Sequence, residues 1–232
     1  MAIDDIQAVV HDLGPEGVGF SVLEELIPDG IVDQAYTNLD DSLPWYEQHN
    51  SFRNRRGVMV HQNFEVFGHK LSRGSQEMLV HLPFIQALGH VVTTEVVEPL
   101  GEHFPSLQSW EADECVAQKY KDQEGYLTWH KDLERHPGII VIANILGIGK
   151  LSARRHEHSK IHQTDLYPGD ILLLRAPGLY PAKLDVRLEH AVDTVHGPNG
   201  RISVTYRANL LPDEPIEDFH YHNWQPVQPV KS

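Results

Sequence analysis

A series of short apolar runs, each ended by a turn signal, fills the chain from Trp110 onward and limits the folds that it can form. Short runs bounded by Gly, Pro, Asn and Asp are typical of β-strands, and their close spacing is that of an antiparallel barrel or a double-sheet jelly roll. The turns read HisProGly at 136–138, TyrProGlyAsp at 167–170 and HisGlyProAsnGly at 196–200. We expect strands over Cys115–Tyr120, Tyr126–Trp129, Ile139–Leu146, Ile171–Arg175, Val186–Val195 and Ile202–Leu210.

The first part of the chain has a mixed pattern. A short strand is expected over Gly19–Leu26, and Pro28 stands where a helix could begin before apolar residues at helical spacing. A second helix should begin at Pro83 and end at Pro99 and Gly101, since proline and glycine commonly terminate helices. The basic segment 53–73 should form strands and a loop.

The length and these patterns favour one domain that is mainly β (α+β), with helices that buttress one side. We expect three regions in that domain: an N-terminal segment at 1–109, a core at 110–210 and a covering tail at 211–232. The one cysteine, Cys115, allows no intramolecular disulfide and is expected in the core. The N-terminus has acids where a signal peptide has basic residues, and no apolar run is long enough for a membrane helix. These features predict a cytoplasmic protein with no membrane partner.

Charge bears on the class of partner. The chain has 19 Lys and Arg against 33 Asp and Glu, a formal net charge of −14. A net negative charge opposes binding to a phosphate backbone, although a local basic patch can override it. The segment 53–73 holds the one basic concentration, which includes ArgAsnArgArg at 53–56. We therefore favour a small-molecule substrate and keep nucleic acid as the alternative.

The sequence TrpHisLysAsp at 129–132 brings a candidate metal site. His130 and Asp132 are two residues apart in a β-rich context, so their side chains leave the same face of a strand or strand end and can meet one ion. His190 is the best third ligand, and two histidines with one carboxylate form the facial triad of non-haem Fe(II) oxygenases. His196 competes with His190 but lies in a turn, where we expect it to face solvent. Unrelated surface residues are the other interpretation, because HisXAsp alone is common.

The last expected strand carries a second signal. Its period-two alternation puts polar residues on one face and apolar residues on the other. Such a face often meets water. Here the strand follows His190 by one hairpin, so the polar face could instead line the inside of a barrel, where an arginine offers a two-pronged donor to a carboxylate. The polar residues are Arg201, Ser203, Thr205, Arg207 and Asn209.

The order HisXAsp, a distal His and then ArgX5Arg resembles the AlkB-like branch of the Fe(II)/2-oxoglutarate dioxygenases over about Trp110–Leu210. The resemblance implies a double-stranded β-helix (jelly roll) that binds Fe(II) and the cosubstrate 2-oxoglutarate. It implies that Arg201 pairs with the distal carboxylate of 2-oxoglutarate and that Arg207 lies near its metal-chelating end. The other cosubstrate contacts that it implies are Ser203, Tyr120 and, more weakly, Gln118.

The resemblance implies an oxidoreductase that hydroxylates a C–H bond while 2-oxoglutarate becomes succinate and CO2. The nucleic-acid-repairing members have a TyrXTyrSerGly-like stretch before the barrel, and this chain has GlnAsnPheGluValPheGlyHis at 62–69. That departure favours a small organic substrate, such as an amino acid or a natural-product intermediate, over the oxidative demethylation of RNA or DNA. A non-catalytic jelly-roll binding module is a third hypothesis, which the complete set of ligands and arginines opposes.

Several other residues have a simpler interpretation. The pair His156 and His158 could imitate a cupin metal site, but their charged neighbours favour an exposed loop. Arg154 or Arg155 could still reach the cosubstrate. Trp129 is expected to pack inside the barrel, with a role in lining the substrate pocket as the second interpretation. His220 and His222 are expected to be features of the tail.

Overall fold

The computed structural model describes residues 6–42, 46–48, 58–63, 83–112, 114–120, 122–123, 125–132, 134, 136–181, 187–208 and 224–226. Its helical elements are α1 (Ile6–Leu13), α2 (Asp29–Ser42), α4 (Pro83–Val91), the π-helix η1 (Val92–Val97), α5 (Glu98–Gly101) and the short 3-10 helix η2 (Pro105–Leu107). None of the helices in these ranges is both long and apolar enough to span a membrane.

Strands dominate the rest of the described chain. Those of the N-terminal segment are β1 (Phe20–Leu23), β2 (Tyr46–Gln48) and β3 (Val58–Asn63). The strands that follow are β4 (Glu114–Tyr120), β5 (Leu127–His130), β6 (Ile139–Leu146), β7 (Ile148–Arg154), β8 (His162–Leu166), β9 (Ile171–Arg175), β10 (Glu189–His196), β11 (Arg201–Arg207) and β12 (Trp224–Pro226).

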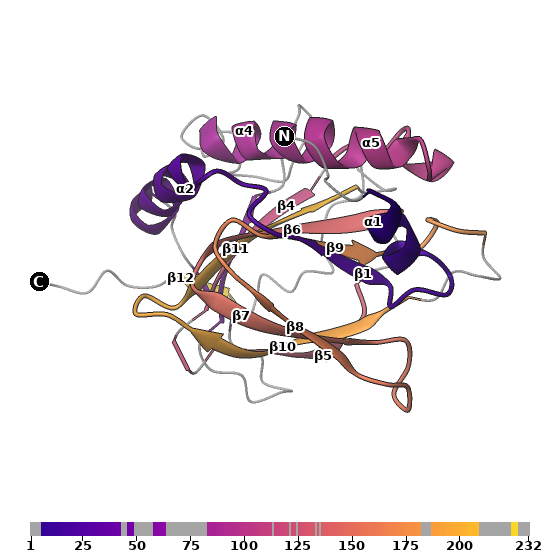
Figure 1. Ribbon diagram of the computed structural model, residues 1–232. Helices are drawn as coiled ribbons and strands as arrows, with labels where there is room; N and C mark the ends of the chain where they lie inside the picture. Colours follow the sequence, from indigo (N-terminus) through magenta and orange to yellow (C-terminus); the bar gives the residue numbers. More distant parts are fainter. Residues whose placement is uncertain are drawn as a thin grey trace, which may run out of the picture.

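These strands form two antiparallel sheets that face each other. The large sheet has the order β1-β9-β6-β11-β4-β3-β2-β12, and the small sheet has the order β5-β10-β7-β8. Figure 1 shows the helices on the far side of the large sheet from the small sheet. The molecule is therefore a jelly roll with a layer of helices on one side, as the sequence predicts.

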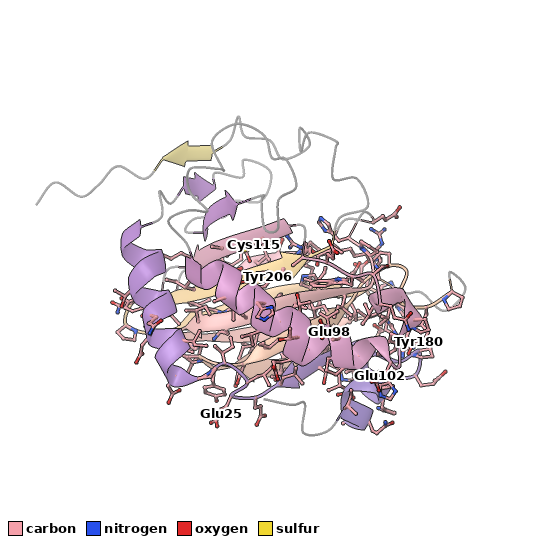
Figure 2. All side chains as sticks on the ribbon, turned by 90° about the horizontal axis from the view of Figure 1, so that it is seen from above. Glu25, Glu98, Glu102, Cys115, Tyr180 and Tyr206 are labelled. Atoms are coloured by element: carbon pink, nitrogen blue, oxygen red, sulfur yellow. The ribbon has the colours of Figure 1, made fainter. Side chains whose placement is uncertain are left out.

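Both faces of the large sheet are buried, which explains the continuous apolar runs of its central strands. Its helix-facing side packs with residues of α1, α4, η1 and α5 in one core that includes Cys115, Val204 and Tyr206. Figure 2 shows Cys115 and Tyr206 on strands that the helices cross. Its other side packs against the small sheet through a second core that includes Ile140, Leu151 and Leu174. The prediction that Cys115 is a core residue is confirmed, since it is buried.

Pro99 does not end its helix, contrary to the sequence analysis. The helix that begins at Pro83 widens into the π-helix η1 and continues as α5 through Gly101. The N–H of Glu98 donates to the carbonyl of Thr93, five residues earlier. Pro99 thereby falls in the first turn of α5, where its missing N–H costs little.

The sequence analysis missed strands β7 and β8. Both strands lack an unbroken apolar run, because Lys150 interrupts β7 and Gln163 and Asp165 interrupt β8. The hairpin between them leaves His156 and His158 exposed, as expected of a loop. The N-terminal segment and the tail also add strands to the large sheet: β1 pairs with β9, β3 pairs with β4, and β12 pairs with β2. Within the basic segment 53–73, only 58–63 lies among the described residues, and it forms β3.

Candidate metal and cosubstrate site

The structure brings His130, Asp132 and His190 together at one end of the small sheet. His130 is the last residue of β5, and it lies directly opposite His190 of β10 in the antiparallel register. Their rings are 4.2 Å apart between centroids. Asp132 follows β5 by two residues, and one potential ligand atom from each of the three side chains lies within 4.8 Å of the others. Among the described residues, this cluster has the composition and spacing to hold one metal ion.

Hydrogen bonds orient these ligands. Nδ1 of His130 lies 2.8 Å from the carbonyl oxygen of Thr128. A carbonyl only accepts, so Nδ1 carries the proton and Nε2 keeps a lone pair for a metal. Nε2 of His190 lies 3.3 Å from Oδ2 of Asp132. The cluster therefore presents two imidazole nitrogens and a carboxylate, which suits Fe(II) among the metals that prefer nitrogen and oxygen ligands.

The ionisation states of His190 and Asp132 favour the binding of a cation. Burial lowers the pKa of His190 to about 3, with a further lowering by His130, so its imidazole is neutral at pH 7. Burial alone would raise the pKa of Asp132, but the Arg207 guanidinium together with His190, His130 and His136 outweighs it and holds that pKa well below its usual range. Arg207 makes the largest of these opposing contributions and so helps to keep Asp132 ionised.

The polar face of β11 points into the space between the sheets. Arg201, Ser203 and Thr205 are buried, at 2%, 0% and 1% exposure. The register places Arg201 opposite Tyr120 and Ser203 opposite Gln118 of β4, so these four residues form one patch on the inner face of the large sheet. The hydroxyl of Tyr120 donates to Gln118 at 3.2 Å, and the Arg201 guanidinium lies 5.2 Å from the Tyr120 ring. The alternative in which this face meets water is therefore wrong.

This patch has the features of an anion site. Arg201 has no carboxylate partner among the described residues, and its Nε donates to the neutral Asn144 at 2.7 Å. Burial lowers its pKa from the ordinary value, which shows that the charge is desolvated. The Ser203 hydroxyl is also buried without a hydrogen-bond partner within the described part of the chain. A buried cation beside an unsatisfied hydroxyl fits a carboxylate such as the distal one of 2-oxoglutarate.

Arg207 lies beside the metal cluster. Its Nη2 is 3.0 Å from Oδ1 of Asp132, so it pairs with the aspartate in this structure. The resemblance places Arg207 near the chelating end of 2-oxoglutarate, and a position next to Asp132 is compatible with that role.

The rival histidines lie elsewhere. His196 is exposed at the far end of β10, and His156 and His158 are exposed in the β7–β8 hairpin. His220 and His222 lie outside the described residues. Gly200, with φ of +77°, closes the turn before Arg201, and a side chain there would collide with the carbonyl of Tyr120. This tight turn separates His196 from the site and starts β11 at Arg201.

Trp129 does not pack inside the barrel. The Arg154 guanidinium lies 4.2 Å above its ring, and Nε of Arg154 pairs with Glu189 at 2.8 Å. Trp129 and Glu189 each precede a histidine of the metal cluster, and successive strand residues face opposite sides of a sheet. The stack therefore lies on the outer face of the small sheet, and both interpretations of Trp129 were wrong. Arg155 donates to the carbonyls of Pro15 and Gly17.

Two residues near the site were not identified from the sequence. Arg187 donates to the backbone carbonyl of Asp132 at 3.2 Å and pairs with Glu134 at 2.9 Å, so it holds the segment after β5. Asn144 accepts the hydrogen bond of Arg201 Nε. A polar residue within the apolar run Ile139–Leu146 was the available signal for Asn144. Nothing in the local pattern distinguished Arg187.

Comparisons with known proteins give the fold. No family model and no curated protein matches the sequence. Among solved structures, a 2OG-Fe(II) oxygenase family oxidoreductase from Burkholderia pseudomallei is similar, with a TM-score of 0.60 and 13% identity over 90% of this chain and 93% of that one. A prolyl hydroxylase from Trichoplax adhaerens in complex with a peptide fragment has a TM-score of 0.54 and 14% identity over 89% and 90%.

A third similar structure is OsALKBH1, with a TM-score of 0.55 and 15% identity over 82% of this chain and 97% of that one. These likenesses cover most of each chain and agree with the two-sheet topology. The chain has the double-stranded β-helix fold of the 2-oxoglutarate/Fe(II) oxygenases.

Proposed function

We propose that this protein is an Fe(II)/2-oxoglutarate-dependent oxygenase that hydroxylates a C–H bond of a small organic molecule. The observation that carries the proposal is the pairing of two sites between the sheets. One is the His130, Asp132 and His190 cluster, with ligand atoms within 4.8 Å of one another. The other is the buried Arg201, which has no carboxylate partner among the described residues. A jelly-roll binding module has no need of both.

The residues divide the chemical work. His130, Asp132 and His190 would hold Fe(II) on one face, which leaves its other positions open. When bound, Fe(II) with 2-oxoglutarate and oxygen supplies the oxidising power, and the by-products are succinate and CO2. Arg201 and Ser203 would bind the distal carboxylate, and Tyr120 and Gln118 would line the same patch. Arg207 helps to keep Asp132 ionised and would hold its carboxylate in place for the metal.

We place the protein in the AlkB-like branch of this fold. The support is the order of HisXAsp, the distal His190 and the pair Arg201 and Arg207. Identity of 15% to OsALKBH1 supports the fold alone, so the branch rests on the motif order.

A small substrate is supported by the charges near the metal cluster. Three cations there, among the described residues, pair with acids: Lys131 lies 3.8 Å and Arg154 2.8 Å from Glu189, and Arg187 lies 2.9 Å from Glu134. Cations neutralised in this way, in a chain of net charge −14, offer little to a phosphate backbone. The basic run 53–56, outside the described residues, is the feature that favours the alternative of nucleic-acid demethylation.

The test is succinate formation from 2-oxoglutarate with Fe(II) and oxygen, across a panel of amino acids, other small metabolites and methylated oligonucleotides. We expect stimulation by a small molecule and none in Asp132→Ala. Stimulation by methylated oligonucleotides alone would overturn the small-molecule assignment. Absence of any 2-oxoglutarate turnover or binding would overturn the oxygenase assignment.

A further inference from the structure

Arg201 is held from two sides by residues that neither the motif nor the resemblance includes. Asn144 is in β6 of the large sheet and Gly149 is in β7 of the small sheet, so the guanidinium lies between the two sheets. Figure 1 shows these two strands on facing sheets. Both neighbours are buried. Their contacts indicate what each contributes to the position of Arg201.

The position of Asn144 is fixed by hydrogen bonds that do not involve Arg201. Its side-chain amide nitrogen donates to the carbonyls of Gly147 at 2.8 Å and Leu166 at 3.1 Å, which uses both of its N–H groups. Its backbone N–H donates to Asp170 at 2.9 Å, and its carbonyl accepts from Gly169 at 2.9 Å. Oδ1 is therefore fixed, and it accepts from Nε of Arg201 at 2.7 Å.

The alternation of β6 explains why this asparagine faces Arg201. Ser203 pairs with Asn144, whereas Ile202 pairs with Leu146, so β6 has a bulge between these positions. Asn144 lies on the same face of β6 as Ile140 and Ile142, which pack toward the small sheet, so the two-residue period of the strand turns its side chain inward. The bulge follows Asn144 and affects Leu146 instead. The inward amide of Asn144 accepts a hydrogen bond that no apolar residue could.

Gly149 provides the space for the arginine side chain. A Cβ at this position would lie 2.5 Å from Nε, 2.7 Å from Cδ and 3.0 Å from Cζ of Arg201. The first two distances are shorter than real Cβ contacts, so any other residue would displace the guanidinium. Gly149 has no backbone angle that requires glycine. The close approach of Arg201 therefore explains why β7 has a glycine at this position.

We propose that Asn144 and Gly149 are positioning residues that fix the Arg201 guanidinium and thereby set the affinity for the dicarboxylate cosubstrate. This inference rests on the proposed function. Because Nε donates to Asn144, the two Nη groups are the donors left for a carboxylate. A guanidinium fixed in this way loses less freedom on binding than a mobile one, which raises affinity.

The test measures 2-oxoglutarate binding by anaerobic calorimetry to the Fe(II)-loaded protein. Asn144→Ala removes the acceptor of Arg201, and Asn144→Asp keeps its size but adds a carboxylate that competes for the guanidinium. Gly149→Ala displaces the guanidinium. Each variant should bind 2-oxoglutarate at least about tenfold more weakly, the effect of one charge-assisted hydrogen bond. Fe(II) affinity should stay unchanged.

Two control variants match these changes. Gln163→Ala removes an amide from the exposed part of β8, and Gly101→Ala adds a methyl that meets no atom closer than 3.7 Å. Both should bind 2-oxoglutarate as the wild type does. Melting temperatures provide a second measurement that needs no ligand. Gly149→Ala should lower the melting temperature when it is introduced into the wild type, and it should lower it much less when it is introduced into Arg201→Ala.

The outcomes separate this inference from the proposed function. If the wild type fails to bind 2-oxoglutarate, the proposed function is wrong. If the wild type binds it and the folded Asn144→Ala, Asn144→Asp and Gly149→Ala variants bind it equally well, the positioning role is overturned while the oxygenase assignment stands. An equal fall in melting temperature in both Arg201 backgrounds would also overturn the role of Gly149.

Discussion

Nη2 of Arg207 lies 3.0 Å from Oδ1 of Asp132, and this ion pair joins the two sheets at the metal cluster. Arg207 ends β11 of the large sheet, and Asp132 follows β5 of the small sheet. The side chains are 13% and 12% exposed, so solvent screens the pair little. The pair therefore fixes the charge and the orientation of one ligand from across the site.

Replacing Arg207 should weaken metal binding. In Arg207→Gln, Asp132 loses its charged partner, its pKa rises, and its carboxylate is less well oriented. Loss of such an outer partner commonly costs 10–100-fold in metal affinity. Calorimetric titration with Fe(II) under anaerobic conditions measures the loss. The control is Arg154→Gln on the outer face of the small sheet, which should leave Fe(II) affinity near that of the wild type. Equal affinity in the Arg207 and Arg154 variants would contradict this account of the ion pair.

Arg201→Lys should raise the 2-oxoglutarate concentration needed for half-maximal turnover. Lysine keeps the charge but cannot both donate to Asn144 and present two parallel donors to a carboxylate. The expected loss is about 1.5–3 kcal/mol, the contribution of a hydrogen bond to a charged group. Steady-state turnover at varied 2-oxoglutarate measures it, and Fe(II) affinity should change little. Unaltered 2-oxoglutarate dependence would remove Arg201 from the site.

The metal-free protein should lose stability as the pH falls below about 6.5. Burial and His130 lower the pKa of His190 from 6.5 to about 3 in the folded state, so the unfolded chain takes up a proton that the folded protein does not. The free energy of unfolding then falls with decreasing pH, by at most about 1.4 kcal/mol per pH unit for this group. Asp132, whose folded-state pKa is also lowered, adds a loss of the same sign below about pH 4.

Urea unfolding at several pH values between about 7 and 4 measures this effect. His190→Gln removes the titrating group and should flatten the decline, and His196→Gln, at an exposed position, should leave it unchanged. A decline of equal steepness in the wild type and His190→Gln would show that another group causes it.

Oligonucleotide binding should be weak, in the non-specific range of about 10⁻⁴ M or worse at physiological salt, because the chain has a net charge of −14. Titration at several salt concentrations measures both the affinity and its dependence on salt. Replacing Arg53, Arg55 and Arg56 with Ser tests the basic segment. Micromolar binding that salt weakens steeply and that the triple variant loses would favour nucleic acid as the substrate.

The sequence was sufficient for the parts of the fold that have local signals. Alternation in β11 depends only on the two-residue period of a strand, and Arg201 lies on the inner face that this period predicts. The HisXAsp pair stands at a strand end, because His130 is the last residue of β5 and Asp132 follows it by two residues. The turn at 167–170 was marked by its proline and glycine. Asp170 there accepts from the N–H groups of Tyr167 and Glu25 and so ties the turn to β1.

The remaining features depend on contacts that lie far apart in the sequence. Strands β7 and β8 escaped recognition because the outer face of the small sheet carries charged and polar residues, as in the pair Arg154 and Glu189. Asn144 acquires its role only through Arg201, which lies 57 residues later in the chain. The continuation of the helix through Pro99 depends on the π-helix before it. No periodicity argument contains such information.

The most direct test of the central claim is anaerobic calorimetry of 2-oxoglutarate binding with and without Fe(II), in the wild type and in single alanine variants of the cluster. We predict that 2-oxoglutarate binds the wild type tightly only with Fe(II). His130→Ala, Asp132→Ala and His190→Ala should each lose Fe(II) binding and Fe(II)-dependent 2-oxoglutarate binding, because each removes one of three protein ligands. His196→Ala, at an exposed position, should retain both. Equal 2-oxoglutarate binding with and without Fe(II), or loss of Fe(II) in His196→Ala but not in His190→Ala, would contradict the account.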